Sequence, residues 1–508
     1  RPRRGAYFKV WWEIMVSCTS ERGAQVTEEQ VKDLRSFLAD YRASYPDDVL
    51  DVHVPIKAEY ECTAIGKHFE DLGKYPLVFF HRVITASGQL SRFPLMINVL
   101  GDRRKLAHAI GSTFEDVTID WRGRVWEAKH QPVVVSRSQA PVKENVLRGD
   151  QVNLLDLPIM RIHEMDPGPY ITAGMLLTFH PDKWIDNSAL QRGFIAGPRE
   201  IRCLLAPSTH NYFNYVAYGE RGKEMKVAYW VGHHPAVTMG AHSGLAYPES
   251  HYVTASAVAA QPIRLVPSET LGDEFLVPAD AEFVIEGIMV PGKRALEAPF
   301  GEYPRYYGPQ RMGEVFDVTA LTYRNDAIWD SFLVGINNNY GGAQEEGNIY
   351  AVVKRAVPQV QRVYCPVSGS GRFHAYIQIR KTHEGQPREA IMAALSSSSM
   401  VKHVIVVDED IDIFDDRWVL WAVATRSQWD RDLVVIPNCQ GAILDPSTGE
   451  RGLGTKGGID ATKPAPPKRF PLRVSLPKEV LERVTLEEYI GPEALAKVPG
   501  QREMKPRR

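Results

Sequence analysis

Cysteine, long apolar runs and charge of one sign are all scarce in this 508-residue chain. Its five cysteines are scattered and form no CxxC pair, which argues against a zinc-stapled or disulfide-stapled fold and indicates a reduced, intracellular protein of the cytoplasm. No run of about 18 apolar residues occurs, so no membrane span is expected. The net charge of −2 gives no global attraction to nucleic acid or to an anionic membrane, and we expect neither as a partner.

The composition that is present is that of an ordinary globular protein, with 44% hydrophobic and 24% charged residues. At about 150 residues per domain, the length suggests two to four domains. Residues 1–14 are basic and aromatic but lack the apolar core and the cleavage site of a secretory signal. We interpret them as a tag or upstream sequence ahead of Met15.

The first part of the chain alternates helix and strand signals. A helix is predicted over 28–43, because Thr27 and Gln30 form a capping-box signal ahead of apolar residues at helical spacing. The apolar run at 95–100 predicts a short buried strand, followed by a glycine turn and a second helix. Residues 15–130 are therefore expected to form an N-terminal α/β domain.

The middle of the chain, residues 131–325, is predicted to be mostly β, which favours a barrel or a sandwich. Its strand signals are rich in β-branched residues and are separated by Gly and Pro; they lie at 132–135, 170–179, 282–290 and 315–324. Alternation of helix and strand returns over 326–465, with helices expected near 347–357 and 387–396 and a strand at 403–407. The Pro-rich and charged tail, 466–508, is expected to pack loosely or against a partner subunit.

The segment Glu297-Ala-Pro-Phe-Gly-Glu302 places two carboxylates around a Pro and a Gly. A tight turn there would point both side chains into one pocket. Close carboxylates do not both ionise cheaply, so one of them would keep a proton near neutral pH, as a general acid must. On spacing alone, however, a surface turn with two solvated glutamates is favoured, since charged residues are mostly exposed.

Two histidine segments are candidate metal ligands. His210 follows a strand-like segment inside a polar patch, although a lone histidine is more often structural. His233 and His234 are adjacent, and on a strand they would point to opposite faces and not serve one metal.

Three further motifs have a chemical and a structural interpretation. The glycine-rich run 452–463 is either a flexible surface loop or a phosphate-binding loop that contains Lys456, although it lacks the Walker spacing. The acidic run 408–412 is more simply a solvated strand exit or a helix start than a metal site. The Trp-rich stretch 418–429 has the spacing of a core helix, and we interpret it as packing.

Several separate segments, taken in order, resemble the UbiD family of decarboxylases. They are FPLMINVLGDRRKLAHAIG, DPGPYITAG, EAPFGEYPRYYG, VIVVDEDIDIFDDRWVLWAVATR and GTKGGIDATKP, and the resemblance runs from about residue 30 to 465. It implies an α/β plus β fold: an N-terminal α/β domain, a central split β-barrel similar to flavin reductases, and a C-terminal α/β domain that mediates dimerisation. It also implies a cofactor, prenylated FMN, which a separate prenyltransferase supplies, together with Mn²⁺ or Mg²⁺ and K⁺.

The resemblance assigns roles residue by residue. It implies a catalytic group of Arg192, Glu297 and Glu302, in which Glu302 donates the proton and Glu297 supports Arg192. It implies that the metal and, through it, the cofactor phosphate are held by Asn187, His210 and Glu249. The run DNSALQRGF departs here from the family's usual N-x-G-x-Y-R.

Further cofactor contacts are implied for Gln191, for Arg192 itself, and for Lys456 beside the phosphate. The implied reaction is the reversible, non-oxidative decarboxylation of an aromatic or heteroaromatic acid, with that acid and CO2 as small-molecule partners and a homodimer or higher homo-oligomer as the assembly. The intact EAPFGEY segment favours heteroaryl or cinnamate-like acids. Two alternatives remain open: a redox flavoprotein that transfers hydride with ordinary FMN, and a non-catalytic family member.

Overall fold

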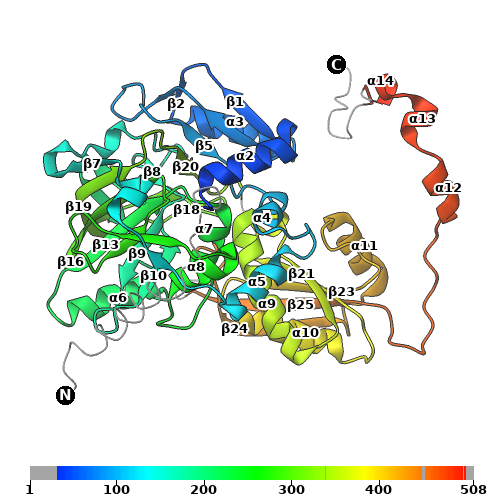
Figure 1. Cartoon of the computed structure of the whole chain (residues 1–508). Helices are drawn as coiled ribbons and strands as arrows, with labels where there is room; N and C mark the ends of the chain where they lie inside the picture. The colour runs from blue at the N-terminus through cyan, green and yellow to red at the C-terminus, as the bar shows by residue number, and fades with distance from the viewer. Residues whose placement is uncertain (1–30, 338, 449–451, 496, 499–508) are drawn as a thin grey trace. The chain divides into compact units, whose positions relative to one another are not determined.

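A computed structural model describes residues 31–337, 339–448, 452–495 and 497–498. The chain divides into a main unit, residues 1–381 with 385–462, and a small one, residues 382–384 with 463–508. The predicted upstream segment, Met15 and the capping pair Thr27 and Gln30 lie outside the described residues. Figure 1 shows three neighbouring regions in the main unit, with α5 (Val117–Glu127) beside α9 (Asn339–Ala356) and β20 (Trp329–Ser331) beside the N-terminal strands.

The N-terminal part combines helices with a parallel and antiparallel sheet. Its sheet has the order β1-β3-β5-β20. The last strand, β20, comes from far along the chain and pairs in parallel with β5. The bounds are α2 (Leu34–Ser44), β1 (Val49–Val52), β2 (Ile56–Lys57), α3 (Glu61–Asp71), β3 (Leu77–Phe80), β4 (Val83–Ile84), β5 (Leu95–Ile97), α4 (Arg103–Ile110), α5 (Val117–Glu127) and β20 (Trp329–Ser331).

The first helix begins later than the capping signal predicts. Asp33 is the N-cap: its side chain accepts a hydrogen bond from the Ser36 backbone N–H, and the Ser36 side chain accepts one from the Asp33 N–H. This reciprocal pair satisfies N–H groups at the helix start. The second predicted helix, α4, ends at Gly111 in the left-handed conformation that Gly adopts without strain.

The middle of the chain is a large antiparallel sheet that curls into a half-barrel (Figure 1). Its order is β10-β9-β13-β16-β19-β12-β11-β8, and β7 also pairs with β19. The strands are β7 (Asn145–Arg148), β8 (Tyr170–Ile171), β9 (Met175–Phe179), β10 (Asp186–Leu190), β11 (Gly193–Gly197), β12 (Glu200–Cys203), β13 (Met225–Val231), β16 (Phe283–Glu297) and β19 (Arg311–Tyr323).

Short helices and a small sheet pack beside the half-barrel. They are α6 (His210–Gly219), α7 (Pro235–Ala241), α8 (His251–Ala259), β6 (Val133–Val134), β14 (Arg264–Pro267) and β15 (Leu276–Pro278), and a two-stranded ribbon of β17 (Phe300–Gly301) and β18 (Tyr307–Gly308) follows β16. The prediction of a single strand over 170–179 is wrong. Its two halves lie apart in the sheet, because β8 pairs with β11 whereas β9 pairs with β10 and β13.

The C-terminal part of the main unit is again α/β. Its sheet has the order β21-β22-β23-β25-β24, with the edge strand β24 antiparallel to β25. The elements are α9 (Asn339–Ala356), β21 (Val360–Tyr364), β22 (His374–Ile379), α10 (Gln386–Ser397), β23 (His403–Asp408), α11 (Asp416–Arg426), β24 (Leu433–Gln440) and β25 (Leu453–Ala461). In the small unit, α12 (Lys478–Arg483), α13 (Leu486–Ile490) and α14 (Pro492–Leu495) follow an extended segment.

Three expectations need correction here. The glycine-rich run is not a loop, because most of it is strand β25. The Trp-rich helix α11 is not a core helix: only Val419 and Ala422 are buried, whereas Trp418 and Leu420 are exposed. His234 is not on a strand, since it caps the start of α7 by accepting a hydrogen bond from the Ala236 N–H.

The acidic run at the end of β23 is paired with an arginine. Arg426 pairs with Asp408 and Asp410, and Asp415 caps α11. No three His, Cys, Asp or Glu side chains gather into a metal cluster in the described ranges. The four cysteines within these ranges, Cys62, Cys203, Cys365 and Cys439, are free thiols.

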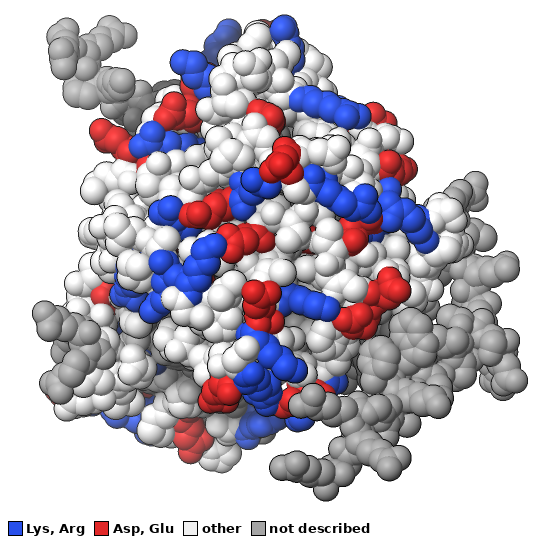
Figure 2. Space-filling view, turned by 90° about the vertical axis from the view of Figure 1, so that its left-hand side faces the viewer, with Lys and Arg blue, Asp and Glu red and all other residues white. Residues whose placement is uncertain are grey.

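The surface in Figure 2 carries both signs of charge. Lys and Arg alternate with Asp and Glu across this face, so it presents no field of one sign. Of the helices that the structure describes, none is both long and apolar enough to span a bilayer.

Candidate active site

A cavity of about 920 Å³ opens beside the half-barrel. Its walls come from β10 and the residues after β12, from the ribbon after β16, from the start of α9, and from residues 440–444. Ligand cavities range from about 300 to 1,000 Å³, so this one lies at the large end. Asn187, Gln191, Arg192, His210 and Glu302 all line it.

The predicted catalytic group is brought together. Arg192 donates two parallel hydrogen bonds to Glu297, from Nε to Oε1 at 2.9 Å and from Nη2 to Oε2 at 2.8 Å. Its remaining nitrogen, Nη1, forms an ion pair with Oε1 of Glu302. The Glu297 side chain is 0% exposed and that of Glu302 is 10% exposed. The expectation of a solvated surface turn, which spacing alone favours, is therefore wrong.

Neighbouring rings and the backbone fix the position of Arg192. Its guanidinium lies over the Phe300 ring, 4.9 Å from the centroid. Its carbonyl accepts a hydrogen bond of 3.3 Å from the buried Tyr229 hydroxyl. That hydroxyl is also 3.2 Å from the Cys203 sulfur. Burial raises the pKa of Cys203 to about 12, so the thiol stays neutral.

The two glutamates come together because the chain turns sharply between them. Glu297 ends β16, and Ala298 takes a φ of 74°, in the left-handed region that a non-Gly residue occupies only under constraint. Gly301 then packs against the His163 ring, which a Cβ at that position would overlap. The Gly301 N–H donates a 3.0 Å hydrogen bond to the fully buried Asp166, so Asp166 holds the turn that carries Glu302.

Asn187 belongs to a buried amide network. Its Nδ2 donates a 2.6 Å hydrogen bond to Oδ1 of Asn211, which also accepts one from the Thr178 hydroxyl. With the amide nitrogen engaged in the protein, the Asn187 side-chain oxygen is the atom left to bind a ligand in the cavity. An amide oxygen is a suitable ligand for Mn²⁺ or Mg²⁺.

His210 and Glu249 are placed differently from each other. His210 begins α6, lines the cavity and is half-buried; burial lowers its pKa, and the charge of Glu249 raises it. Glu249 lies within electrostatic reach of His210 but is exposed and does not line the cavity. The structure thus brings Asn187 and His210 to one cavity and leaves Glu249 at its margin.

The loop that carries Glu249 is anchored by a buried carboxylate. Asp186 accepts hydrogen bonds from the Ser250 hydroxyl and from the Tyr252 N–H, and burial raises its pKa to about 6. His251 begins α8 next to this anchor and lines the cavity. Its Nδ1 lies 2.6 Å from the Ala241 carbonyl, whereas its buried Nε2 has no hydrogen-bond partner among the described residues.

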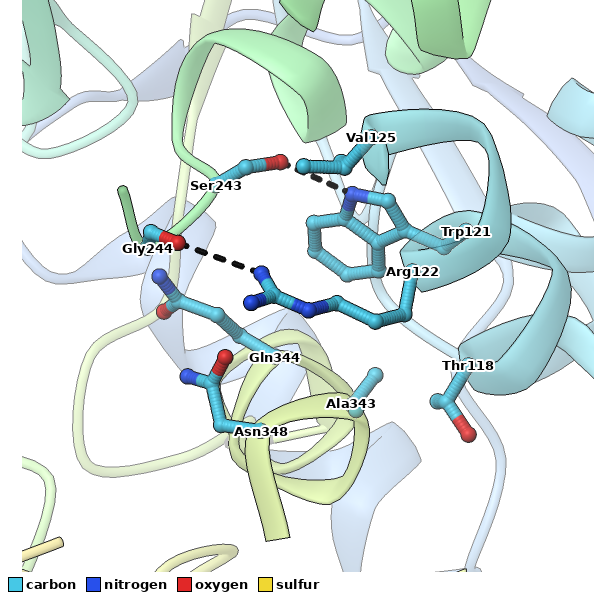
Figure 3. A pocket seen from close by; sticks show the side chains of 10 residues that line it. Thr118, Trp121, Arg122, Val125, Ser243, Gly244, Ala343, Gln344 and Asn348 are labelled. Atoms are coloured by element: carbon cyan, nitrogen blue, oxygen red, sulfur yellow. Dashed lines mark hydrogen bonds between the residues drawn. The ribbon is translucent and has the colours of Figure 1, made fainter. Parts of the chain in front are cut away.

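The loop that carries Glu249 is also held near its start, at Ser243 and Gly244, where it meets α5 and α9 (Figure 3). In this view Trp121 and Arg122 of α5 point toward the Ser243–Gly244 turn, donating hydrogen bonds of 3.0 Å to the Ser243 hydroxyl and 3.1 Å to the Gly244 carbonyl. On the other side, Gln344 of α9 donates a 2.6 Å hydrogen bond to the His242 carbonyl. The gap between them measures about 20 Å³, room for one water molecule.

Lys456 is not where the sequence places it. It lies on β25 with 6% exposure, does not line the cavity, and donates hydrogen bonds to the carbonyls of Leu395 at 3.0 Å and Ser398 at 2.6 Å. It thus caps the end of helix α10, where a cation is favoured. The interpretation of this run as a flexible surface loop is therefore wrong, and the contact of Lys456 with the cofactor phosphate stays a prediction.

Replacing Lys456 with Met is therefore expected to destabilise the fold. The variant keeps the aliphatic length but leaves two buried carbonyls without a donor, which costs about 1–3 kcal/mol. The denaturant midpoint of the purified protein measures this loss. Lys129→Met, at an exposed surface position, is the control and should leave the midpoint in place. An unchanged midpoint for Lys456→Met would contradict the capping role.

Sequence reasoning missed the residues that support the site. These residues are Asp166, Tyr229 and His251. The fold brings them to the catalytic group or to the cavity from distant parts of the sequence. Asp166 lies inside DPGPYITAG, so that motif was the available signal for it. Tyr229 and His251 lie in an apolar strand and a helix start, and no local pattern distinguishes them from core residues.

Comparison with known proteins identifies the family. Three family models cover the chain in order: the N-terminal, Rift-related and C-terminal domains of 3-octaprenyl-4-hydroxybenzoate carboxy-lyase, at residues 44–122, 133–337 and 338–461. An anhydromevalonate phosphate decarboxylase of Methanothermobacter thermautotrophicus is 30% identical over 82% of this chain and 95% of its own length. A phenolic acid decarboxylase of Sedimentibacter hydroxybenzoicus is 31% identical over 88% and 94%.

Solved structures show the same fold with a flavin. The UbiD-class enzyme HmfF from Pelotomaculum thermopropionicum, in complex with FMN, superposes with a TM-score of 0.83 at 36% identity, over 90% of this chain and 100% of that one. An evolved dimeric form of the same enzyme, in complex with prenylated FMN, gives 0.80 at 34% identity over 91% and 100%. The matched segments span most of the sequence, and the chain belongs to the UbiD family of carboxy-lyases.

Proposed function

We propose that this protein catalyses the reversible, non-oxidative decarboxylation of an aromatic or heteroaromatic acid with prenylated FMN. The observation that supports it most is the arginine shared by two buried carboxylates at the edge of a large cavity. We call Arg192, Glu297 and Glu302 the reaction end of the cavity. Asn187 and His210 form its metal end.

The residues at the metal end fit a divalent cation and a flavin phosphate. They offer an amide oxygen at Asn187 and a neutral imidazole at His210, and Glu249 adds a carboxylate from the adjoining loop. This mixed oxygen and nitrogen set suits Mn²⁺ or Mg²⁺. When bound, prenylated FMN would supply an electron sink for the carbon that loses CO2. Gln191 also lines the cavity and would contact the flavin.

At the reaction end, each side chain has a distinct task. Arg192 attracts the substrate carboxylate, and its double hydrogen bond to Glu297 keeps the guanidinium oriented. Glu302 lies against the third nitrogen of Arg192 and faces the cavity, so it is placed to deliver a proton to the carbon from which CO2 departs. A neutral CO2 then leaves an apolar pocket, and high CO2 reverses the reaction.

Co-expression with a prenyltransferase tests the whole proposal. We expect the purified protein to show a prenylated-flavin spectrum and to release CO2 from at least one member of a panel of heteroaryl, cinnamate-like and phenolic acids. A protein that binds only ordinary FMN and oxidises a nicotinamide instead would be a hydride-transfer flavoprotein. A protein with prenylated FMN and no turnover on any acid would be a non-catalytic family member.

Replacing His210 with Ala is expected to weaken Mn²⁺ binding by roughly tenfold or more, since even second-shell changes cost that much at metal sites. Isothermal titration with Mn²⁺ in the presence of FMN measures this without turnover. His180→Ala is the matched control, because both histidine rings pack on Tyr247. The ring centroids lie 5.2 Å from that of Tyr247 for His210 and 5.7 Å for His180, but His180 does not line the cavity. Equal affinity in both variants would rule out His210 as a ligand.

We further propose the finer assignments that accompany this function. The half-barrel, residues 131–325, would be the flavin-binding split barrel, between an α/β domain at 15–130 and a dimerisation domain at 326–465. K⁺ would accompany the divalent ion. The assembly would be a homodimer or larger, and size-exclusion chromatography with light scattering measures it.

A further inference from the structure

A second cationic side chain reaches the cavity from the C-terminal part of the chain. Arg372 lies in the turn before β22, is half-buried and lines the cavity. Among the described residues it makes no ion pair and its guanidinium donates no hydrogen bond, although Glu345 of α9 lines the same cavity. By contrast, Arg192 is fully engaged by its two glutamates.

The fold holds the Arg372 guanidinium in place without neutralising it. The guanidinium carbon, Cζ, lies over the Tyr303 ring, 5.0 Å from the ring centroid. Gly341, in the first turn of α9, leaves room for it: a Cβ there would lie 2.9 Å from Nη2 and 3.0 Å from Nε. Stacking on an aromatic face orients a guanidinium and leaves its edge free to donate hydrogen bonds.

The position of Arg372 relates it to the reaction end. Tyr303, on which it stacks, directly follows the proton donor Glu302. After burial, which is the larger cause, the charge of Arg372 lowers the pKa of His242, another residue that lines the cavity, to about 3. The guanidinium thus acts on the cavity from the wall beside Glu302, whereas the proposed phosphate ligands Asn187 and His210 come from β10 and α6.

We infer that Arg372 binds a second anionic group of the substrate, a carboxylate or a phosphate remote from the carboxylate that is lost. An unpaired, half-buried arginine that lines the cavity is suited to such an anion, because charge-assisted hydrogen bonds are the stronger ones. The preferred substrates are then doubly anionic acids. This inference rests on the proposed function, since it names the substrate class of the same site.

Arg311 is the alternative within the same cavity. It also lines the wall and makes no ion pair among the described residues. However, no aromatic ring of the described residues lies against its guanidinium, so nothing pre-orients it as Tyr303 orients Arg372. It therefore serves as the comparison for Arg372.

The test measures binding, not turnover. The protein is loaded with ordinary FMN, and dissociation constants are measured by titration for two matched pairs: pyrrole-2,5-dicarboxylate against pyrrole-2-carboxylate, and benzene-1,4-dicarboxylate against benzoate. For the parent protein we expect at least one diacid to bind roughly 10- to 100-fold more tightly than its monoacid. Arg372→Gln should reduce this ratio to about twofold or less, and Arg92→Gln, at an exposed arginine that contacts Tyr323, should retain it.

Each other outcome overturns the inference. No diacid preference in the parent, a preference that survives Arg372→Gln, or one that only Arg311→Gln removes would each exclude Arg372 as the anion site. Loss of FMN from Arg372→Gln would show that the cofactor phosphate is the anion. The binding test uses ordinary FMN and needs no turnover, so the two ideas fail separately. Absence of CO2 release with prenylated FMN would overturn the proposed function and leave a diacid preference intact.

Discussion

Glu302→Gln is expected to lower the rate of decarboxylation by roughly 10²–10⁴-fold, the range for a lost general acid. The amide keeps the shape of the side chain and removes the transferable proton. It also weakens the ion pair to Arg192, although the double hydrogen bond from Arg192 to Glu297 remains. Substrate affinity should therefore change much less than the rate.

Hydrogen–deuterium exchange at the product carbon separates these effects. Exchange requires the proton donor and the cofactor but not CO2 release, so it should fall with Glu302→Gln as the forward rate does. Glu314→Gln is the matched control, because Glu314 is a buried carboxylate of the adjacent strand β19 that accepts a hydrogen bond from the Leu205 N–H and does not touch Arg192. Exchange at the parental rate in Glu302→Gln would assign the acid to another group.

Arg192→Ala is expected to reduce both activity and stability. It removes the group that attracts the substrate carboxylate, a loss of roughly 30- to 5,000-fold in kcat/KM if the truncation costs about 2–5 kcal/mol. It also leaves the fully buried Glu297 without its partner, which costs about 3–5 kcal/mol in the free energy of unfolding.

A second buried ion pair is the control that separates the loss of activity from the loss of stability. Arg264 and Asp280 are as deeply buried, with side-chain exposures of 13% and 3% against 13% and 0% for Arg192 and Glu297, and neither residue lines the cavity. Arg264→Ala should match the fall in denaturant midpoint while the folded enzyme keeps its kcat/KM. If both variants lose activity in proportion to stability alone, Arg192 has no role in substrate binding.

The sequence predicts those parts of the site that lie within one motif. The pair Glu297 and Glu302 is visible because a five-residue spacing across Pro and Gly brings two side chains to one turn. Its burial is not visible, because it depends on Asp166 and Arg192, which come from other parts of the chain. Arg192 and Asn187 enter only through the resemblance, since the run DNSALQRGF has no chemical pattern of its own.

Errors arise where tertiary contacts decide the environment of a charged residue. Lys456 reads as a loop cation because four glycines surround it, yet β23 and β24 flank those glycines as strands and bury the lysine. This close packing needs Gly at position 458, because a Cβ there would lie only 2.5 Å from a methyl carbon of Ile391. Trp418 shows the opposite case, in which a helical apolar pattern faces outward on α11.

The start of α9 divides the residues that line the cavity into those before it in the chain and those after it. The side chains proposed for chemistry lie between residues 187 and 302, whereas Arg372, Met400 and the 440–444 segment follow the start of α9. A chimera joined at that point would exchange one wall with a relative while retaining the reacting groups. Recombination, in nature or in a library, could then shift substrate preference in one event without rebuilding the chemistry.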